Sequence, residues 1–365
     1  MLTSLQLQRF KGHRDTTIPL GRVTVLVGPN GAGKTSVLQA LRLVDNLLTK
    51  GSQDALQGDM IPQDLLCREG SGPIIASVAG QANGLAWDLT VSFSPAPTDG
   101  SPQGARYVWT YGDTRFTQAT IAPPLNDNSG PQFAPRLAHF ISPAALYHLD
   151  ARQIAAVAYS TEENPRVGED GLNTAAVLAT LKLERDELFE RIEEELRKIV
   201  PTIQRVRVRR VKILRSPDEE NARIGHKVFF DFVGAHDVPA HAASEGTLIT
   251  LALLTALFSP NRPRLLLLDD IDQSLHPQAQ MEFMRQLKRL LENFPEVQLV
   301  ATTHSPYILD ELDPSEVRVF ALRKDGSVAC RSLSEHPQAE KMRGVLTSGQ
   351  LWSLDPEWRW VLEER

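Results

Sequence analysis

The feature that most constrains this chain is a glycine-rich segment near its N-terminus. Residues 28–35 read GPNGAGKT, which fits the pattern G-x-x-x-x-G-K-[ST], and they follow the apolar run Val23–Val27. Glycines allow successive backbone N–H groups to turn toward a phosphate, and a helix that starts here adds a favourable partial charge. Lys34 would then contact the β- and γ-phosphates, and the Thr35 hydroxyl would bind Mg²⁺. The segment predicts a strand, a phosphate-binding loop and a helix, and therefore a site for a nucleoside triphosphate and Mg²⁺. The residues expected at the nucleotide lie in the loop and the first helical turn: Asn30, Gly31, Gly33, Lys34, Thr35 and Ser36.

A second apolar run, Leu265–Leu268, ends in the carboxylates Asp269 and Asp270. A phosphate-binding loop needs a carboxylate at the end of a neighbouring strand to hold Mg²⁺. We therefore expect Asp269 to bind the metal and Asp270 to orient the attacking water. His304 follows a third predicted strand, Gln298–Thr303, and in a parallel sheet it would lie at the same edge. Asp270 and His304 are thus the expected catalytic residues, and the predicted reaction is Mg²⁺-dependent hydrolysis of the γ-phosphate.

A second anion site is expected at the start of a later helix. Ser244 can cap this helix, and Gly246 leaves the approach to its N-terminus open. One chain cannot easily place both sites on one γ-phosphate, whereas two chains packed head to tail can. The sequence therefore predicts a homodimer that forms on ATP binding.

The order of elements indicates an α/β protein with an insertion. Lys34 and Asp269 are 235 residues apart (269 − 34). Between them we expect antiparallel strands, a helix from Asn173 to Val200 and a basic strand. Strand and helix then alternate over the last third, which predicts a parallel sheet. The expected domains are a head at 1–335, with a helical arm and basic strand inserted at 160–235, and a Trp-rich tail at 336–365.

Taken in order, these motifs resemble an ABC-type ATPase. More narrowly, FKGH at 10–13, LLLLDDIDQSLHP at 265–277 and ATTHSP at 301–306 resemble the SMC/RecF/OLD branch, the ATPase heads of DNA maintenance and phage defence. The resemblance runs from Met1 to about Leu322, and the ending VLTSGQLWSLDPEW looks like that of standalone bacterial members. It implies a P-loop NTPase fold with a mixed sheet, an antiparallel β lobe and a short helical arm.

The resemblance also implies roles for individual residues. Asp269 would bind magnesium, Ser244 and Gly246 would form the signature, and His304 would act as the switch. Asp272 to His276 would form a loop that crosses the dimer, and Lys11 would lie near the phosphates.

The chain departs from the family pattern at several places. Asp270 stands where the family usually has Glu, and the shorter side chain predicts slow hydrolysis. The signature reads ASEGT and not LSGGQ, which disfavours a transporter ATPase. Gln153 and Gln132 are both candidates for the lid glutamine. The C-terminal nuclease domain of OLD nucleases is not expected, because the sequence ends too soon to contain it.

Composition bounds the partners. Lys+Arg 39 against Asp+Glu 45 give a net charge of -6, so DNA binding would need a local patch. The strand RVRVRRVKILR at 205–215 is the candidate, although its charge is equally typical of a protected edge strand. Cys67 and Cys330, without disulfide or zinc spacing, fit a cytoplasmic protein, and no run approaches the roughly 18 apolar residues that span a membrane.

These observations favour an ATP-driven switch in DNA repair or anti-phage defence, with DNA as a partner. The alternative is a slowly hydrolysing sensor that holds an effector protein, such as a nuclease or toxin, without contacting DNA.

Overall fold

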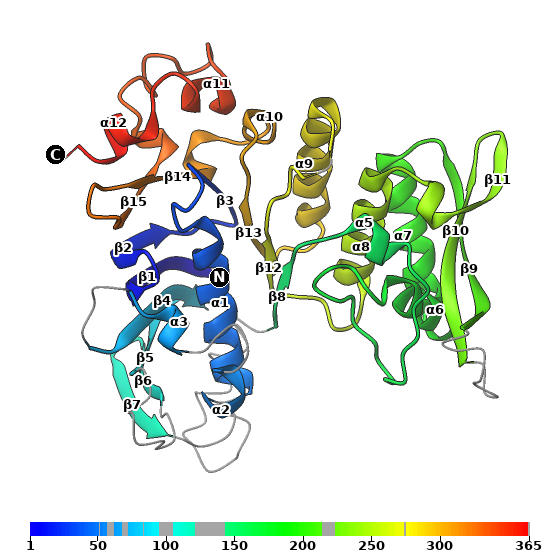
Figure 1. The fold of residues 1–365 in the computed structure, drawn as a ribbon, viewed down its shortest axis with the longest axis horizontal. Coiled ribbons are helices and arrows are strands. Elements are labelled where there is room, and N and C mark those ends of the chain that lie inside the picture. The colour runs from blue at the N-terminus through cyan, green and yellow to red at the C-terminus, as the bar shows by residue number, and fades with distance from the viewer. Residues whose placement is uncertain are drawn as a thin grey trace. The chain divides into compact units, whose positions relative to one another are not determined.

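The chain folds into two compact units, which are described separately (Figure 1). The computed structural model describes residues 1–50, 52–56, 62–67, 72–82, 84–94, 105–120, 143–213, 223–273 and 275–363. The first unit comprises Met1–Leu146, Arg264–Asp272 and Leu291–Arg365, and the second comprises Tyr147–Pro263 and Gln273–Leu290. The first unit therefore holds the phosphate-binding loop, the two carboxylates and His304, whereas the second holds Ser244 and Gly246.

A six-stranded mixed sheet organises the candidate site of the first unit. Its order is β15-β14-β3-β13-β12-β8. The strands are β3 (Val23–Val27), β8 (Ala144–Tyr147), β12 (Leu265–Leu268), β13 (Gln298–Thr302), β14 (Val317–Leu322) and β15 (Val328–Ser332). β3, β12 and β13 are buried at every position, as expected of parallel strands with both faces covered. β12 pairs in parallel with β13, and β13 with β3, so the segments that follow these strands meet at one edge. The predicted parallel pairing of these strands is confirmed, within a sheet that is mixed because β15 pairs antiparallel with β14.

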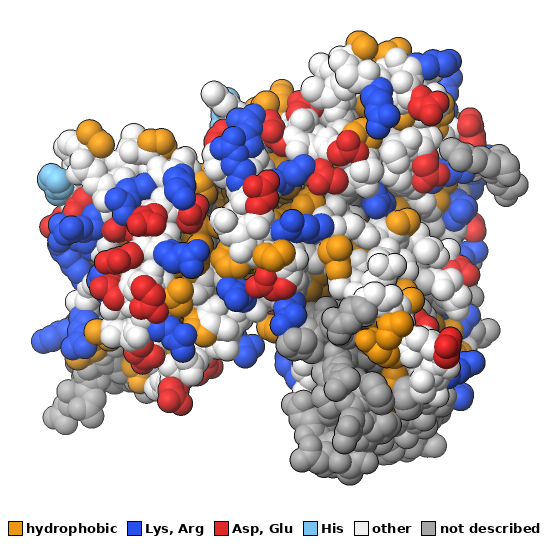
Figure 2. Space-filling view, turned by 180° about the vertical axis from the view of Figure 1, so that it is seen from behind, with side chains coloured by type: hydrophobic (Ala, Val, Ile, Leu, Met, Phe, Trp, Pro, Cys, Tyr) orange, Lys and Arg blue, Asp and Glu red, His pale blue; other side chains and the backbone are white. Residues whose placement is uncertain are grey.

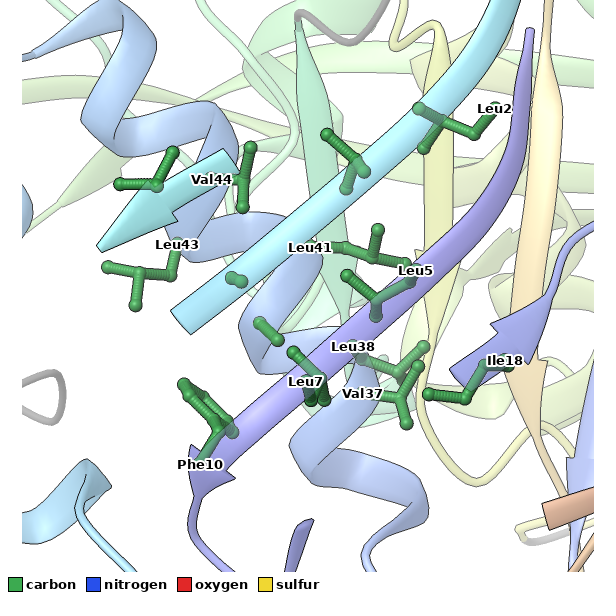
Figure 3. Packing of buried hydrophobic residues seen from close by; sticks show 14 of the residues in the cluster. Leu2, Leu5, Leu7, Phe10, Ile18, Val37, Leu38, Leu41, Leu43 and Val44 are labelled. Carbon is green, nitrogen blue, oxygen red and sulfur yellow. The ribbon is translucent and has the colours of Figure 1, made fainter. Parts of the chain in front are cut away.

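An antiparallel sheet packs against the helix that follows the phosphate-binding loop. Its order is β2-β1-β4-β5-β6-β7. The strands are β1 (Leu2–Phe10), β2 (His13–Pro19), β4 (Ile74–Ala82), β5 (Leu85–Phe93), β6 (Ala105–Tyr111) and β7 (Thr114–Thr120). Figure 3 shows Leu5 and Leu7 of β1 beside Val37, Leu38 and Leu41 of α1 (Lys34–Thr49), all of them fully buried. This apolar contact fixes α1, and with it the loop at its N-terminus. Two short helices, α2 (Ser52–Ala55) and α3 (Pro62–Leu65), follow α1.

The second unit contains the helical arm and the basic strand. A three-stranded antiparallel sheet, ordered β11-β10-β9, is formed by β9 (Ile203–Ile213), β10 (Arg223–Phe232) and β11 (Ala235–Pro239). The helices are α5 (Ala151–Ile154), α6 (Thr174–Glu184), α7 (Asp186–Ile199), α8 (Glu245–Phe258) and most of α9 (Pro277–Glu292), with a 3₁₀ turn at Ala240–Ala242. None of the described helices is long and apolar enough to cross a bilayer.

The single helix expected from Asn173 to Val200 is two helices. The chain leaves helical geometry at Arg185, where φ is −146° and ψ is 60°. α6 is buried around most of its circumference, whereas α7 buries only the stripe Phe189, Ile192 and Leu196. The break therefore separates a core helix from an amphipathic one, a change in environment that apolar spacing alone does not reveal.

The C-terminal tail packs on the first unit. It contains α11 (Ser348–Trp352) and α12 (Glu357–Val361), and it follows α10 (Pro306–Leu309) and 3₁₀ turns at Pro314–Glu316 and Leu333–Glu335. The Gly349 N–H donates to Asp310 Oδ1 at 3.1 Å, and Ser348 Oγ donates to the Leu312 carbonyl at 2.7 Å. The tail is thus hydrogen-bonded to the segment that follows His304.

Candidate nucleotide-binding site

The phosphate-binding loop is built on glycines that no other residue could replace without movement. Gly28 and Gly33 have φ values of 142° and 83°, which side chains disfavour. A Cβ at Gly28 would lie 2.5 Å from the Phe320 carbonyl oxygen of β14, and a Cβ at Gly33 would lie 2.6 Å from Nε2 of His13. The loop therefore packs directly on β14 and β2, and its backbone remains open to a ligand.

A buried histidine supports this loop. His13 is fully buried, and its Nε2 lies 3.1 Å from the Gly33 carbonyl. Because a carbonyl only accepts hydrogen bonds, Nε2 carries the proton. Burial lowers the pKa of His13 to about 4, against the smaller opposing effect of the Gly33 hydrogen bond. The ring is therefore neutral at physiological pH and acts as a fixed donor to the loop.

Lys34 sits at the mouth of the loop with its ammonium held by main-chain oxygens. Its Nζ donates to the carbonyls of Gly28 at 2.9 Å and Pro29 at 3.0 Å. Burial lowers the pKa of Lys34, and the carboxylates of Asp270 and Asp269 partly offset that effect. These two carboxylates are therefore close enough to act on the lysine electrostatically, as a site for a phosphate and a cation requires.

Two hydroxyl groups converge on one carboxylate oxygen. Thr35 Oγ1 donates to Asp269 Oδ1 at 3.1 Å, and Thr302 Oγ1 donates to the same oxygen at 2.6 Å. Thr302 Oγ1 also accepts from the Asp270 N–H at 2.8 Å. Thr302, which is fully buried at the end of β13, thus ties both carboxylates to the neighbouring strand.

The oxygen pair suits a magnesium ion that keeps other ligands. Among the described residues, no group of three or more His, Cys, Asp and Glu side chains is arranged to hold a metal. Mg²⁺ is commonly bound by one or two protein oxygens together with phosphates and water. Thr35 Oγ1 and Asp269 Oδ1 are such a pair, so the residues present fit the ion.

A family model described as "AAA domain, putative AbiEii toxin, Type IV TA system" matches residues 23–310, which include Thr35, Asp269, Asp270 and His304. The chain belongs to this family. The match omits Lys11 and the tail, so it gives no support to the predictions made for those parts of this AAA-domain protein.

Two curated relatives match shorter stretches of this AAA-domain protein. The OLD nuclease of Thermus scotoductus is 36% identical over 101 residues, which are 28% of this chain and 16% of that protein. The Septu protein PtuA of Bacillus mycoides is 30% identical over 134 residues, 34% of this chain and 18% of that protein. The chain thus matches less than a fifth of the length of either relative.

Solved structures of SMC heads share the fold. An Smc head bound to the C-terminal winged-helix domain of ScpA has a TM-score of 0.55 at 17% identity, over 91% of this chain and 98% of that one. An Smc head from Pyrococcus furiosus, with an extended coiled coil, has a TM-score of 0.50 at 16% identity, over 94% and 98% of the two chains. The predicted P-loop ATPase head of the SMC/OLD type is confirmed.

The first unit of this AAA-domain protein brings together most of the residues predicted at the nucleotide. Thr35, Asp269 and Asp270 are hydrogen-bonded directly or through Thr302. Lys34 interacts electrostatically with both carboxylates. Asn30 and Gly31 are exposed at the loop tip, Ser36 is half-buried on α1, and the His304 side chain is exposed beyond β13. Lys11 donates to Gln39 Oε1 at 2.6 Å, which places its ammonium beside the second turn of α1.

The predicted signature belongs to the second unit. Ser244 caps α8: its Oγ accepts from the Thr247 N–H at 3.3 Å, as expected from the sequence. A Cβ at Gly246 would lie 3.1 Å from Leu275, so the start of α8 packs closely on the loop after β12. Gln153 is exposed on α5 of the same unit, and Gln132 lies outside the described residues.

The basic strand β9 is partly neutralised. Arg207 forms an ion pair with Asp231 at 2.6 Å, and Arg209 is paired with Asp237. These hydrogen bonds hold the pKa values of both aspartates below their usual range. Figure 2 shows blue and red side chains interspersed on the visible face, with no extended basic area there.

Sequence reasoning missed Thr302 and His13 as parts of the site. Both stand inside quoted motifs, ATTHSP and FKGH, but their roles depend on contacts with residues 33 and 20 positions away along the chain (302 − 269 and 33 − 13). The available signal was their position in the sequence. Thr302 comes shortly before His304, and His13 is the first residue of β2, the strand beside the loop.

Proposed function

We propose that this AAA-domain protein binds and hydrolyses Mg-ATP. The observation that carries the proposal is the convergence of the Thr35 and Thr302 hydroxyls on Asp269, beside Lys34 and a glycine-lined loop. This arrangement provides donors for phosphate oxygens and acceptors for a cation within one edge of a sheet. Phosphoryl transfer depends mainly on such positioning and charge stabilisation.

Each residue has a defined task in this proposal. Lys34 neutralises the β- and γ-phosphates, and the loop N–H groups hold the β-phosphate. Thr35 and Asp269 would hold magnesium, which would offset the charge that develops on the phosphate oxygens. Asp270 accepts the proton of the attacking water, and His304 hydrogen-bonds the γ-phosphate or that water.

We further propose that two chains close around two nucleotides. Ser244 caps α8, so one hydroxyl and the backbone N–H groups around Gly246 mark the start of this helix as an anion site. In a head-to-tail dimer, this helix start would meet the γ-phosphate held by the other chain. Closure would then depend on ATP, and hydrolysis would open the dimer.

The leading biological role is an ATP-driven switch in DNA repair or anti-phage defence. The partial match to an OLD nuclease and to a Septu protein supports this proposal. The second role is a slowly hydrolysing sensor that holds an effector protein without contacting DNA. The pairing of Arg207 and Arg209 favours this second role, because paired arginines contribute less to binding a phosphate backbone.

Nucleotide binding is tested with Lys34→Ala. The P-loop backbone alone cannot offset the lost charge, so the variant should no longer bind a fluorescent ATP analogue or hydrolyse ATP. Lys324→Ala removes an exposed lysine from the β14–β15 turn and serves as the matched control. Equal ATP affinity in the two variants would remove the loop from the proposal.

Closure is tested by light scattering with and without ATP. Asp270→Asn should prolong an ATP-bound dimer, because Asp269 still holds the metal while the base is lost. A Ser244→Arg chain should bind ATP but fail to dimerise alone, and mixing it with Lys34→Ala chains should restore one composite site. A monomer under every condition would exclude the dimer mechanism.

A further inference from the structure

Hydrogen bonds join the segment that follows β12 to the end of β13 and to the residues just beyond it. The Asp270 N–H donates to Thr302 Oγ1 at 2.8 Å, and the Ile271 N–H donates to the Thr302 carbonyl at 3.1 Å. Beyond these, Asp272 Oδ1 accepts from Thr303 Oγ1 and from the His304 N–H, the latter at 3.1 Å. The link therefore extends past the two carboxylates and reaches the main chain of His304.

Asp272 is the residue that makes this last connection. One of its carboxylate oxygens accepts two hydrogen bonds, from the hydroxyl of the fully buried Thr303 and from the backbone N–H of His304. Thr303 Oγ1 in turn accepts from the Ser305 N–H at 3.1 Å, which closes a tight turn around His304. A charged acceptor makes these hydrogen bonds stronger than neutral ones.

This geometry fixes the backbone of His304 while its side chain stays exposed. The imidazole can reach only the positions that its own side-chain rotamers allow from a fixed main chain. A displacement of about 1 Å in a positioning group can cost up to about 100-fold in rate. The position of the imidazole therefore depends on the Asp272 carboxylate, which accepts a hydrogen bond from the main chain of His304.

We propose that Asp272 is a positioning residue for His304: it holds the switch histidine in place from the loop that follows the catalytic carboxylates. This inference rests on the proposed ATP hydrolysis.

The test compares Asp272→Ala with Asp272→Asn. The alanine variant removes the acceptor, whereas asparagine keeps an oxygen at the Oδ1 position. We expect Asp272→Ala to lower kcat by about 10- to 100-fold, with ATP affinity within about twofold of wild type. Asp272→Asn should recover most of that loss. Asp310→Ala is the control: this carboxylate lies farther along the segment that follows His304 and accepts the Gly349 N–H. Its removal should leave kcat unchanged.

A double-mutant cycle separates positioning from a general loss of structure. If Asp272 acts through His304, Asp272→Ala combined with His304→Ala should be no slower than His304→Ala alone. The inference would be overturned if the losses in kcat of the two single variants multiplied in the double variant. It would also be overturned if Asp310→Ala lowered kcat as much as Asp272→Ala does. Amide hydrogen exchange at residues 303–305 gives a readout without turnover: exchange should quicken in Asp272→Ala and not in Asp272→Asn. If wild type hydrolyses no ATP, the proposed function fails, and unchanged exchange would separately overturn the positioning role.

Discussion

Replacing Thr302 by valine should weaken the first unit, because one hydroxyl serves both carboxylate residues. Valine keeps the shape of threonine but neither donates to Asp269 nor accepts from the Asp270 N–H. A buried N–H left without a partner costs about 1–3 kcal/mol. Asp269 is half-exposed and keeps Thr35, so we assign only about 1 kcal/mol to its loss. The expected destabilisation of Thr302→Val is therefore about 2–4 kcal/mol.

The matched control is Thr302→Ser, which keeps the hydroxyl and loses one buried methyl group, a change of about 1 kcal/mol. Urea unfolding followed by tryptophan fluorescence measures both variants. All five tryptophans belong to the first unit, so the signal reports the unit that contains Thr302. Thr302→Val should also hydrolyse ATP more slowly than Thr302→Ser, since Asp269 and Asp270 lose their shared anchor.

The two variants decide whether the hydroxyl or the packing matters. If Thr302→Val were as stable as Thr302→Ser, or more stable, the hydrogen bonds at Oγ1 would contribute little. That result would refute the conclusion that β13 positions Asp269, the carboxylate proposed to bind the metal.

Three further predictions follow from contacts elsewhere in the chain. Because the folded pKa of His13 is about 4 and its ordinary value is 6.5, the unfolded chain binds the proton first as pH falls. Stability should therefore drop by about 3 kcal/mol between pH 6.5 and pH 4, and His13→Phe should lack this part of the pH dependence in urea unfolding. Gly349→Ala would place a Cβ 2.2 Å from the Pro306 carbonyl oxygen and should cost about 1–3 kcal/mol, whereas Gly21→Ala, with its nearest contact at 3.4 Å, should be nearly neutral in the same assay. Binding of duplex DNA is titrated at several salt concentrations, in wild type and in a variant with Arg205, Arg207 and Arg209 replaced by alanine. The log–log slope of affinity against salt concentration should flatten by about 0.9 in the variant, not by about 2.7, because two of the three arginines are already paired.

The sequence predicted those parts of the fold that depend on local pattern. Leu265–Leu268 and the helix that starts at Pro277 lie where the apolar spacing placed them, because a buried strand or an amphipathic helix imposes its period on its own residues. The phosphate-binding loop was also predicted from a local pattern, the spacing of its glycines and lysine. The break at Arg185 was missed because both flanking helices carry helical spacing.

Contacts between distant residues could not be predicted in this way. The pairing of Arg207 with Asp231 requires the register of β9 against β10, in which Arg207 lies opposite Phe229. A sequence shows the five basic residues of β9 but not the carboxylates that face them. The same holds for Thr302, whose hydroxyl acts on Asp269 only because β13 lies beside β12 in parallel register.

The backbone conformation at position 270 explains why this residue is an aspartate and not a glutamate. Its φ of 49° lies in the left-handed region, which costs most residues roughly 1–2 kcal/mol but which aspartate adopts more readily because its short side chain interacts locally. Asp270 Oδ1 lies 3.4 Å from Thr302 Oγ1, the atom that also accepts the Asp270 N–H. Glutamate, with one more methylene, would extend farther from this turn and would lose that local contact. The turn that anchors both carboxylates to β13 is therefore suited to the shorter acid, and the shorter acid reaches less far toward an attacking water. If hydrolysis is slow, we expect its cause to be this reach, which the backbone at Asp270 sets.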